Sequence, residues 1–280
     1  MPKIGGHVSA SGGLINAFSN AEKIGADCFQ FFLGPPQMWV QSKQTPEKIA
    51  EFRAKQDETG IGPNFIHGTY LVNLGTQGEE HLQKSIDWLT YGLSIASELG
   101  IRGLIFHLGS HKGLGFEKVL VQVCSALDQV FEKATPGAYL LLENSAGAGG
   151  NIGSTFADLG AILREVHNDR LKICIDTQHA FAAGYDWRTE EGLEAMLSEF
   201  DQYIGLENLV AFQCNDSKTE FKSGRDRHEN IGQGQIGKEA FERLVNHPKL
   251  QNVTYLLEVP GYDDEGPDKP NIDLVKSLIK

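Results

Sequence analysis

The chain alternates between short apolar runs and longer segments of helical periodicity. Each run is rich in β-branched or aromatic residues, and a polar, glycine-bearing turn separates it from a segment whose apolar residues recur every three or four positions. The runs predict eight strands, over 3–8, 27–33, 64–67, 103–108, 138–143, 171–176, 209–215 and 253–259. The periodic segments predict eight helices, over 13–24, 46–59, 79–99, 117–134, 155–167, 189–204, 238–246 and 273–279.

The order of these elements favours a closed parallel sheet over an open one. Thr45 followed by Pro46 is typical of a helix start, and Gly25, Gly60 and Gly100 stand where helices should stop. Eight strands alternating with eight helices predict an α/β protein with a single (β/α)8 TIM-barrel domain over residues 1–280. The nearly continuous apolar strands fit this fold, because they would be covered by helices outside and packed side chains inside.

Composition narrows the class of protein. The 280 residues are 40% apolar and 22% charged, which is ordinary for a globular protein. The four cysteines are scattered without a C-x-x-C pair, no apolar run is long enough to span a membrane, and the start MPKIGGHVSASGG lacks an apolar leader segment. We therefore expect a cytoplasmic protein with reduced thiols.

The net charge bears on the partner. With 25 basic against 37 acidic residues, the formal charge is −12. Such a balance argues against a nucleic-acid partner, because phosphate contacts need cations. The objection weakens if several of the acids hold metal ions, since bound cations reverse the local charge.

Polar residues that suit metal binding stand at the ends of the predicted strands or in the loops after them. They are His67, His107 in FHLGSH, Glu143 in LLENSAG, Asp176 and His179 in IDTQHAF, Asp226 and His228 in DRH, and Glu258 in LLEVPG. Each alone could be a hydrogen-bonded structural residue. In a barrel of this kind, however, all eight would converge on the C-terminal face, where crowded carboxylates repel one another unless cations separate them. Histidine and carboxylate suit zinc, manganese or iron, so we predict a multi-metal site.

The remaining histidines are expected to play other parts. His81, His167 and His247 lie on predicted helices or at helix ends and are interpreted as structural or surface residues. His7 ends the first strand and His111 lies in the loop after the fourth. Both are candidates to orient a metal ligand by hydrogen bonding, not to bind the metal directly.

Several long motifs resemble one known family. They are GGHVSASGGL, HGTYLVNLG, FHLGSH, ENSAGAGGNIG, CIDTQHAFAAGYD, NDSK, DRHENIG and LLEVPG. In this order and at this spacing they are similar to the motifs of endonuclease IV, the second family of apurinic/apyrimidinic (AP) endonucleases. The resemblance runs from residue 4 to about residue 261. It implies a xylose-isomerase-like TIM barrel.

The resemblance also implies an activity and a ligand set. The family cuts the backbone of double-stranded DNA 5′ to abasic sites with three zinc ions, leaving a 3′-hydroxyl and a 5′-deoxyribose phosphate, and it trims 3′ ends. By motif, His67 and His107 would hold one metal, and Glu143 would bridge it to a second. Asp176 and Glu258 would complete much of the second site, and His179, Asp226 and His228 would hold the third. Glu143 and Glu258 would be the catalytic carboxylates. No obligate protein partner is implied.

One expected ligand differs. The family usually has a histidine just before N-D-x-K, where this chain has Gln213. Strand alternation points Gln213 in the ligand direction, but it offers an amide oxygen. An all-oxygen second site would favour harder ions such as manganese or magnesium, so this metal would be held more weakly or would not be zinc. Alternatively, Gln213 is a ligand and little changes.

Residues that would contact DNA are also predicted. Gln37, Met38 and Trp39 follow two prolines, and Tyr70 and Leu71 follow His67; such side chains can wedge into a base stack. Gln37 stands where the family often has arginine, so DNA affinity is expected to be lower. Candidate phosphate contacts are Lys218, Arg225 and Arg227. The alternatives are core packing for Trp39 and Leu71, and solvated loop charges for the three cations.

Two other functions fit part of the pattern. Sugar isomerases and epimerases of the same barrel type place Glu, Asp, His and Glu around one or two metals. Here the histidine of that quartet is missing, and five ligands that an isomerase does not need are present, which favours the nuclease. A catalytically impaired protein that only binds abasic DNA is the other alternative, because Gln213 departs from the family.

Overall fold

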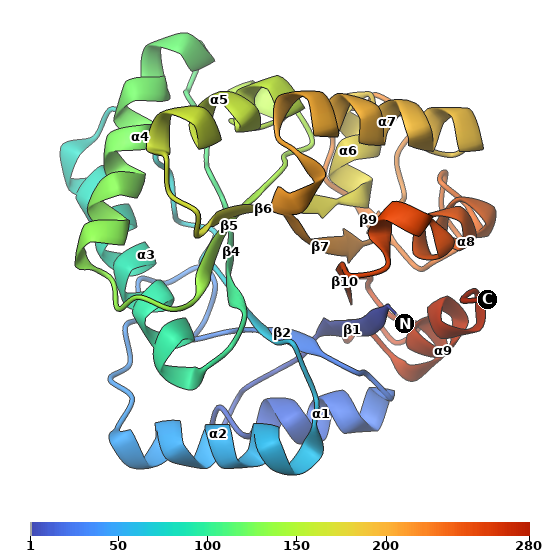
Figure 1. Ribbon diagram of the computed structural model, residues 1–280, viewed down its shortest axis with the longest axis horizontal. Helices are drawn as coiled ribbons and strands as arrows, with labels where there is room; N and C mark the ends of the chain where they lie inside the picture. Colours follow the sequence, from blue (N-terminus) through green and yellow to red (C-terminus); the bar gives the residue numbers. More distant parts are fainter. Residues whose placement is uncertain (1) are drawn as a thin grey trace.

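Eight parallel strands form a closed barrel in the computed structural model, which describes residues 2–280 (Figure 1). The strands are β1 (Lys3–His7), β2 (Phe29–Phe32), β3 (Phe65–His67), β4 (Gly103–His107), β5 (Tyr139–Glu143), β6 (Leu171–Asp176), β7 (Leu209–Cys214) and β10 (Thr254–Leu257). They follow one another around the barrel in chain order, and β1 pairs with both β2 and β10 to close it. The predicted TIM barrel is confirmed.

Helices cover the outside of the barrel (Figure 1). They are α1 (Asn16–Ile24), α2 (Pro46–Thr59), α3 (Glu79–Leu99), α4 (Phe116–Lys133), α5 (Phe156–Val166), α6 (Thr177–Ala183), α7 (Glu190–Tyr203), α8 (Lys238–Asn246) and α9 (Lys269–Ser277), with short 3-10 turns η1 (Ala148–Gly150), η2 (Leu206–Asn208) and η3 (Pro248–Leu250). A two-stranded antiparallel ribbon, β8 (Asp216–Ser217) with β9 (His228–Glu229), lies in the long loop after β7.

Two helices differ from the sequence-based expectation. The prediction missed α6, a seven-residue helix that starts directly after β6; Asp176 caps it by accepting a hydrogen bond from the backbone N–H of His179 at 2.8 Å. The last helix begins at Lys269 and not at 273, because the Asp268 carboxylate caps it and Pro270 is accommodated in its first turn.

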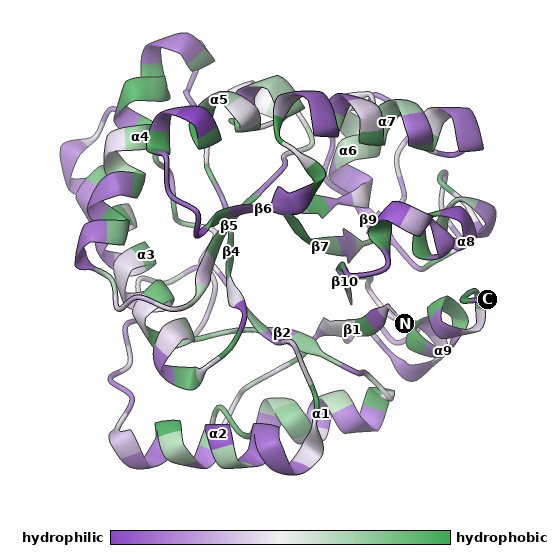
Figure 2. Ribbon diagram, viewed as in Figure 1, coloured by the Kyte–Doolittle hydropathy of each residue, from purple (hydrophilic) through white to green (hydrophobic). Residues whose placement is uncertain are grey.

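Apolar side chains pack in two layers. Hydrophobic residues line the strands, and the helices are more mixed (Figure 2). One cluster fills the space between barrel and helices, and a smaller one fills the barrel itself. The smaller cluster contains Cys28, Phe65, Ile105, Leu141, Cys174, Val210, Ala211 and Leu256. Most of these residues are two positions before a polar residue at a strand end, so the alternation that fills the barrel also aims polar side chains at its mouth.

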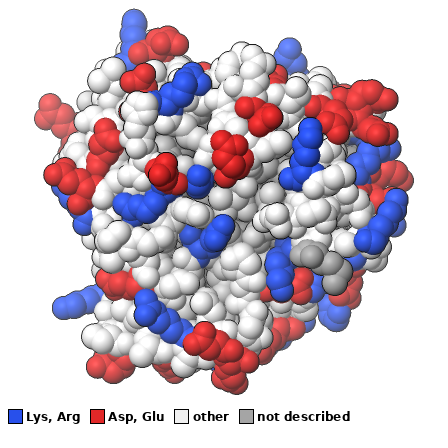
Figure 3. Space-filling view, viewed as in Figure 1, with Lys and Arg blue, Asp and Glu red and all other residues white. Residues whose placement is uncertain are grey.

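The four cysteines are buried and unpaired, as the sequence predicts. Burial raises the pKa of Cys124 to about 11, and that of Cys28 still further, so the thiols stay protonated and unreactive. Surface charges of both signs are interspersed over the face drawn in Figure 3. Within residues 2–280, no helix combines the length and apolar character that crossing a membrane requires.

Asp216 organises the loop that follows β7. Its side chain is fully buried and accepts hydrogen bonds from five backbone N–H groups. The donors are Ser217, Gly232, Gly234, Ile236 and Gly237, at 2.8–3.3 Å. The carboxylate thus ties the ribbon to the turn before α8, and no other carboxylate side chain of the described residues accepts from as many backbone donors.

Replacing Asp216 with alanine is expected to lower the free energy of unfolding by roughly 3 kcal/mol, because it leaves several buried N–H groups without an acceptor. Urea unfolding followed by circular dichroism measures the change. Asp263→Ala, at an exposed loop position, is the matched control and should stay within about 0.5 kcal/mol of the parent protein. Equal stability of the two variants would contradict the role given to Asp216.

Candidate metal centre

Each barrel strand places a polar side chain at or near its C-terminal end, facing the mouth of the barrel. These eight residues are His7, Gln30, His67, His107, Glu143, Asp176, Gln213 and Glu258. The loops above them add His179, Asp226 and His228. A cavity of about 610 Å³ opens here, lined by several of these residues together with Tyr70 and Arg227.

The first group of converging ligand atoms lies at the ends of β3, β4 and β5. His67, His107 and Glu143 each offer one atom, and these atoms lie within 4.8 Å of one another. His67 Nε2 is 3.1 Å from Glu143 Oε2, and His107 Nδ1 is 3.6 Å from Glu143 Oε1. One carboxylate therefore faces two imidazoles from neighbouring strands, an arrangement that suits one divalent cation.

The second group lies where β6, α6 and the ribbon meet. Asp176, His179 and His228 offer atoms within 4.8 Å of one another. The Asp226 carboxylate joins them, with one oxygen 3.3 Å from His179 Nε2 and the other 3.4 Å from His228 Nε2. His179 Nδ1 is in turn 3.2 Å from Glu143 Oε1, so the two groups of ligand atoms are in direct contact.

Two buried nitrogens in the second group lack a hydrogen bond. Nε2 of His179 and Nε2 of His228 have no hydrogen-bond partner of acceptable geometry among the described residues, although carboxylate oxygens lie 3.3–3.4 Å away. A buried polar atom without a partner is costly. Nitrogen and oxygen atoms that face one another without bonding are placed as ligands of a shared cation would be, so the donor set fits metal ions.

Charges at the mouth are strongly coupled. Burial would raise the pKa of the Glu143 carboxyl, but the charge of His107 and the hydrogen bond from His179 hold that pKa well below its usual range. Burial would lower the pKa of His67, but the hydrogen bond to Glu143 and the charge of Glu258 raise it to about 9. Neighbouring carboxylates also raise the pKa of His179, whereas burial lowers the pKa of His107. Without cations, protons on His67 and His179 therefore offset part of the carboxylate charge. Metal ions and protons therefore compete for the same nitrogen atoms.

Between the two groups lies a set of oxygen-rich side chains. Glu258 Oε1 accepts a hydrogen bond from Gln30 Nε2 and is 3.5 Å from His7 Nδ1. The amide of Gln213 faces Glu143, with its nearer atom 2.9 Å from Oε1 and 3.2 Å from Oε2. These side chains, Gln213, Glu258, His7 and Gln30, belong to β7, the end of β10, β1 and β2, which are consecutive neighbours in the barrel.

Two asparagines hold the carboxylates in place. Asn215 Nδ2 donates to Asp176 Oδ2 at 2.7 Å, and Asn215 Oδ1 accepts from the backbone N–H of Glu258 at 2.7 Å. Asn144 Oδ1 accepts from the backbone N–H of Asp176 at 2.6 Å. The backbone carbonyl oxygen of Asn144 lies 3.0 Å from His179 Nδ1. Neither was assigned a role from the sequence, although each directly follows a strand end within one of the family motifs.

Comparisons with known proteins agree with this geometry. A family model described as a xylose isomerase-like TIM barrel matches residues 18–279. The chain is 37% identical to a probable endonuclease 4 of Chloroflexus aggregans over 100% of this chain and 99% of the relative, and 40% identical to that of Halorhodospira halophila over 93% and 89%. The chain belongs to the endonuclease IV family.

Solved structures agree with that membership. The endonuclease IV of Thermus thermophilus superposes with a TM-score of 0.88 at 32% identity, covering 99% of this chain and 98% of that one. A 3-keto-D-glucoside 4-epimerase from E. coli gives a TM-score of 0.69 at 18% identity, over 99% of both chains. The epimerase likeness reflects the shared barrel alone.

Of the predicted DNA-contacting residues of this endonuclease IV family member, Tyr70 and Arg227 line the cavity. Tyr70 is 56% exposed on its wall, with its ring centroid 6.2 Å from that of His67. Arg227 lines the cavity, and Gln37, Lys218 and Arg225 are exposed on the loops. Leu71 is half-buried. Trp39 packs against the core and against His81, which is the structural alternative considered for it.

The remaining histidines lie away from the ligands. His111 Nδ1 accepts hydrogen bonds from two backbone N–H groups of its own loop, so it stabilises that loop and does not orient a metal ligand. His81 bonds to the carbonyl of Leu71, and His247 to Glu194. His7, by contrast, contacts Glu258 as an orienting residue would.

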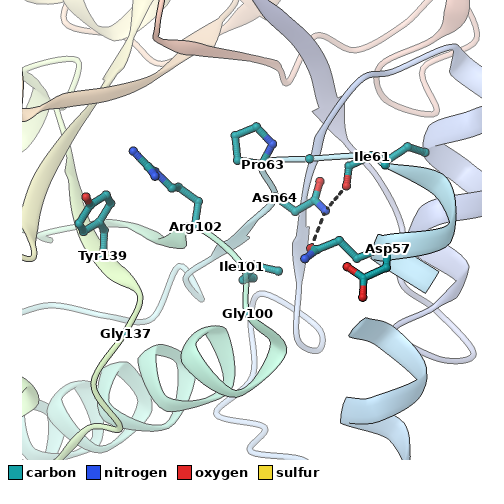
Figure 4. Close-up of a pocket in the computed structure, with 12 residues that line it drawn as sticks. Asp57, Ile61, Pro63, Asn64, Gly100, Ile101, Arg102, Gly137 and Tyr139 are labelled. Carbon is teal, nitrogen blue, oxygen red and sulfur yellow. Dashed lines mark hydrogen bonds between the residues drawn. The ribbon is translucent and has the colours of Figure 1, made fainter. Parts of the chain in front are cut away.

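A second hollow opens at the opposite end of the barrel (Figure 4). It measures about 630 Å³ and is lined by residues that precede β3, β4 and β5, among them Asn64, Arg102 and Gly137. Asn64 is already engaged there, because it donates to the carbonyl of Ile61 and to Gln56. Active sites of such barrels lie at the C-terminal ends of the strands, and the converging ligands agree with that placement.

Proposed function

We propose that this protein is a metal-dependent AP endonuclease that hydrolyses DNA 5′ to abasic sites, leaving a 3′-hydroxyl and a 5′-deoxyribose phosphate, and that it also trims 3′ ends. The single observation that carries the proposal is the convergence of two imidazole–carboxylate groups at the barrel mouth of a chain related over its full length to endonucleases 4. In this proposal the 280 residues act as one barrel domain.

The proposal assigns up to three metal ions to the mouth. His67, His107 and Glu143 would hold one zinc ion, and His179, Asp226 and His228 another. The remaining ion would lie among oxygen ligands, which are Glu143, Asp176, Glu258 and Gln213. Because its ligands are oxygens, this ion is zinc held weakly or a harder ion such as manganese. When bound, the metals supply an activated water and neutralise charge on the phosphate and on the leaving oxygen.

The protein's own residues position the reaction. Glu143 and Glu258 are the catalytic carboxylates in this proposal. Glu258 lines the cavity, and Glu143 is buried against His67 and His107, which line it too. Asn215 fixes the position of Glu258 relative to Asp176 by linking the Asp176 carboxylate to the backbone of Glu258. Arg227 stands at the cavity wall, where its guanidinium can meet a phosphate of the DNA backbone.

Bound metal ions and basic residues on the loops would together offset the acidic net charge where the DNA binds. Divalent ions would make the mouth positive although the chain carries −12 overall. Lys218 and Arg225 lie exposed on the loop beside the ribbon, next to the mouth. Gln37, Tyr70 and Leu71 would enter the distorted base stack at the abasic site.

Incision of a synthetic duplex with one abasic site tests the function. The expected result is a single cut 5′ to the lesion, with a product that a polymerase extends, while an undamaged duplex stays intact. Binding of the abasic duplex without incision would instead support an impaired binder. If the protein neither bound nor cut the abasic duplex but converted a ketose or aldose sugar, the result would support an isomerase.

Replacing Tyr70 with alanine is expected to raise KM for abasic DNA roughly 10-fold, since a stacked aromatic contributes about 1–3 kcal/mol per base. Metal content should not change, because Tyr70 is not a ligand in this proposal and its ring centroid lies 6.2 and 6.4 Å from those of His67 and His107. Tyr203→Ala, a partly exposed tyrosine at the end of α7, is the matched control. A KM that moves equally in both variants would remove Tyr70 from the DNA-binding surface.

A further inference from the structure

Gln30 is a fully buried polar residue in an otherwise aromatic strand, β2 (FQFF). Burying an amide is costly unless it is hydrogen-bonded. Its Nε2 donates to Glu258 Oε1 and lies 3.2 Å from His7 Nδ1, and its Oε1 lies 3.5 Å from Gln213 Nε2. Gln30 therefore joins Glu258, which directly follows β10, to Gln213 of β7, and the proposed function places both around the second metal.

The partners of Gln30 decide which way its amide points. An ionised carboxylate only accepts hydrogen bonds, so the NH2 end of Gln30 must face Glu258. Its oxygen then faces Gln213 and requires a donor. Gln213 meets this requirement with its NH2, which leaves the Gln213 oxygen facing Glu143.

In that orientation, oxygens face each other across a short gap. The Gln213 amide end lies 2.9 and 3.2 Å from the two carboxylate oxygens of Glu143. Turning the Gln213 amide over lets its NH2 donate to the Glu143 oxygens at 2.9 and 3.2 Å, and it leaves the Gln213 oxygen 3.5 Å from the Gln30 oxygen without a donor. In the absence of a cation the turned-over amide therefore satisfies Glu143 but not Gln30. A cation between Gln213 and Glu143 would satisfy every group at once.

We infer that Gln30 is a positioning residue that fixes the amide of Gln213 with its oxygen toward the second metal. Gln213 is then a carbonyl ligand whose orientation is set across the barrel by β2. This inference rests on the proposed metal centre. A glutamine amide can turn either its oxygen or its NH2 toward a metal. The hydrogen bond to Gln30 gives a physical reason why the Gln213 oxygen, and not its NH2, would face the ion.

Equilibrium dialysis against zinc or manganese, with metal content measured by mass spectrometry, tests the inference. Gln30→Met keeps length and volume but removes both hydrogen bonds. It is expected to weaken the most loosely held equivalent about 10- to 100-fold in a chelator competition and to leave the other two unchanged. Full retention of that equivalent would overturn the inference.

A double-mutant cycle separates the route through Gln213 from the direct contact with Glu258. Gln213→Leu should lose the same equivalent, and adding Gln30→Met to Gln213→Leu should cause no further loss. A further loss of similar size would show that Gln30 acts through Glu258 and would overturn the inference. Circular dichroism and thermal unfolding verify that each variant is folded.

A measurement that does not depend on Gln30 variants completes the test. Gln213→His should shift the ratio of bound zinc to manganese at the loosest site toward zinc at least about 10-fold, because imidazole nitrogen replaces a harder oxygen. An unchanged ratio would show that Gln213 is not a ligand and would overturn the inference. If the unaltered protein bound neither ion, the proposed metal centre itself would fail.

Discussion

Replacing Glu143 with glutamine is expected to reduce incision of abasic DNA by roughly 1,000-fold, about 4 kcal/mol of transition-state stabilisation. The Glu143 carboxylate contacts three imidazoles, those of His67, His107 and His179, at 3.1, 3.6 and 3.2 Å. It is thus the side chain that links both groups of ligand atoms. Glutamine preserves the size but replaces one oxygen with a donor that cannot bind a cation and removes the charge.

The same chemical change elsewhere provides the control. Glu194 on α7 lies 2.8 Å from His247 and is half-exposed at the surface, far from the mouth. Glu194→Gln should retain activity within about twofold, because surface pairs contribute little. Metal analysis of Glu143→Gln should show loss of bound ions alongside the loss of incision. An active Glu143→Gln protein with full metal content would exclude Glu143 as a shared ligand.

The barrel was predictable because its strands are encoded locally. Runs such as FHLGSH and LLENSAG switch from apolar to polar where a strand ends. β5 ends at Glu143 as predicted, and β4 ends at His107, one residue before the predicted end. The start of α9 was not predicted correctly, because Pro270 interrupts the periodic pattern. The residue that caps α9, Asp268, is one polar residue among many in that loop. Helix ends depend on such side-chain caps, which periodicity does not register.

The converging ligands follow the same logic. Alternation along each strand aims every second residue into the barrel, so His67, Glu143 and Asp176 could be placed at one mouth from sequence. Gln30 obeys the same alternation but was not predicted, because a neutral amide is a less typical metal-site residue than histidine or carboxylate. A polar residue within FQFF was the available indication.

Contacts across the barrel closure could not be predicted. Gln30 and Glu258 are 228 positions apart, and their hydrogen bond exists only because β1 brings β2 and β10 to either side of itself. The direction of the Gln213 amide depends on that contact in turn. Local propensity carries no information about such pairs, so the chemistry of the second site becomes visible only in three dimensions.

Removing the metals with a chelator is expected to lower incision to the level of the buffer control. The carboxylates at the mouth would lose the cations that bring them together, and the phosphate would meet an acidic surface. Stability should fall as well, because an ion present at about 100 times its dissociation constant contributes about 2.7 kcal/mol. Thermal unfolding with and without chelator measures this second effect independently of activity.

Adding back single metals then separates the sites. Zinc alone is expected to refill the two groups that contain histidine and to restore activity only in part. Zinc followed by manganese should restore it fully, because the site between them is formed by carboxylates and the Gln213 amide. Three tightly bound zinc equivalents with full activity would contradict this preference for a harder ion. The all-oxygen site would then owe its affinity to charge and geometry, and the exchange of histidine for Gln213 would be neutral for metal choice.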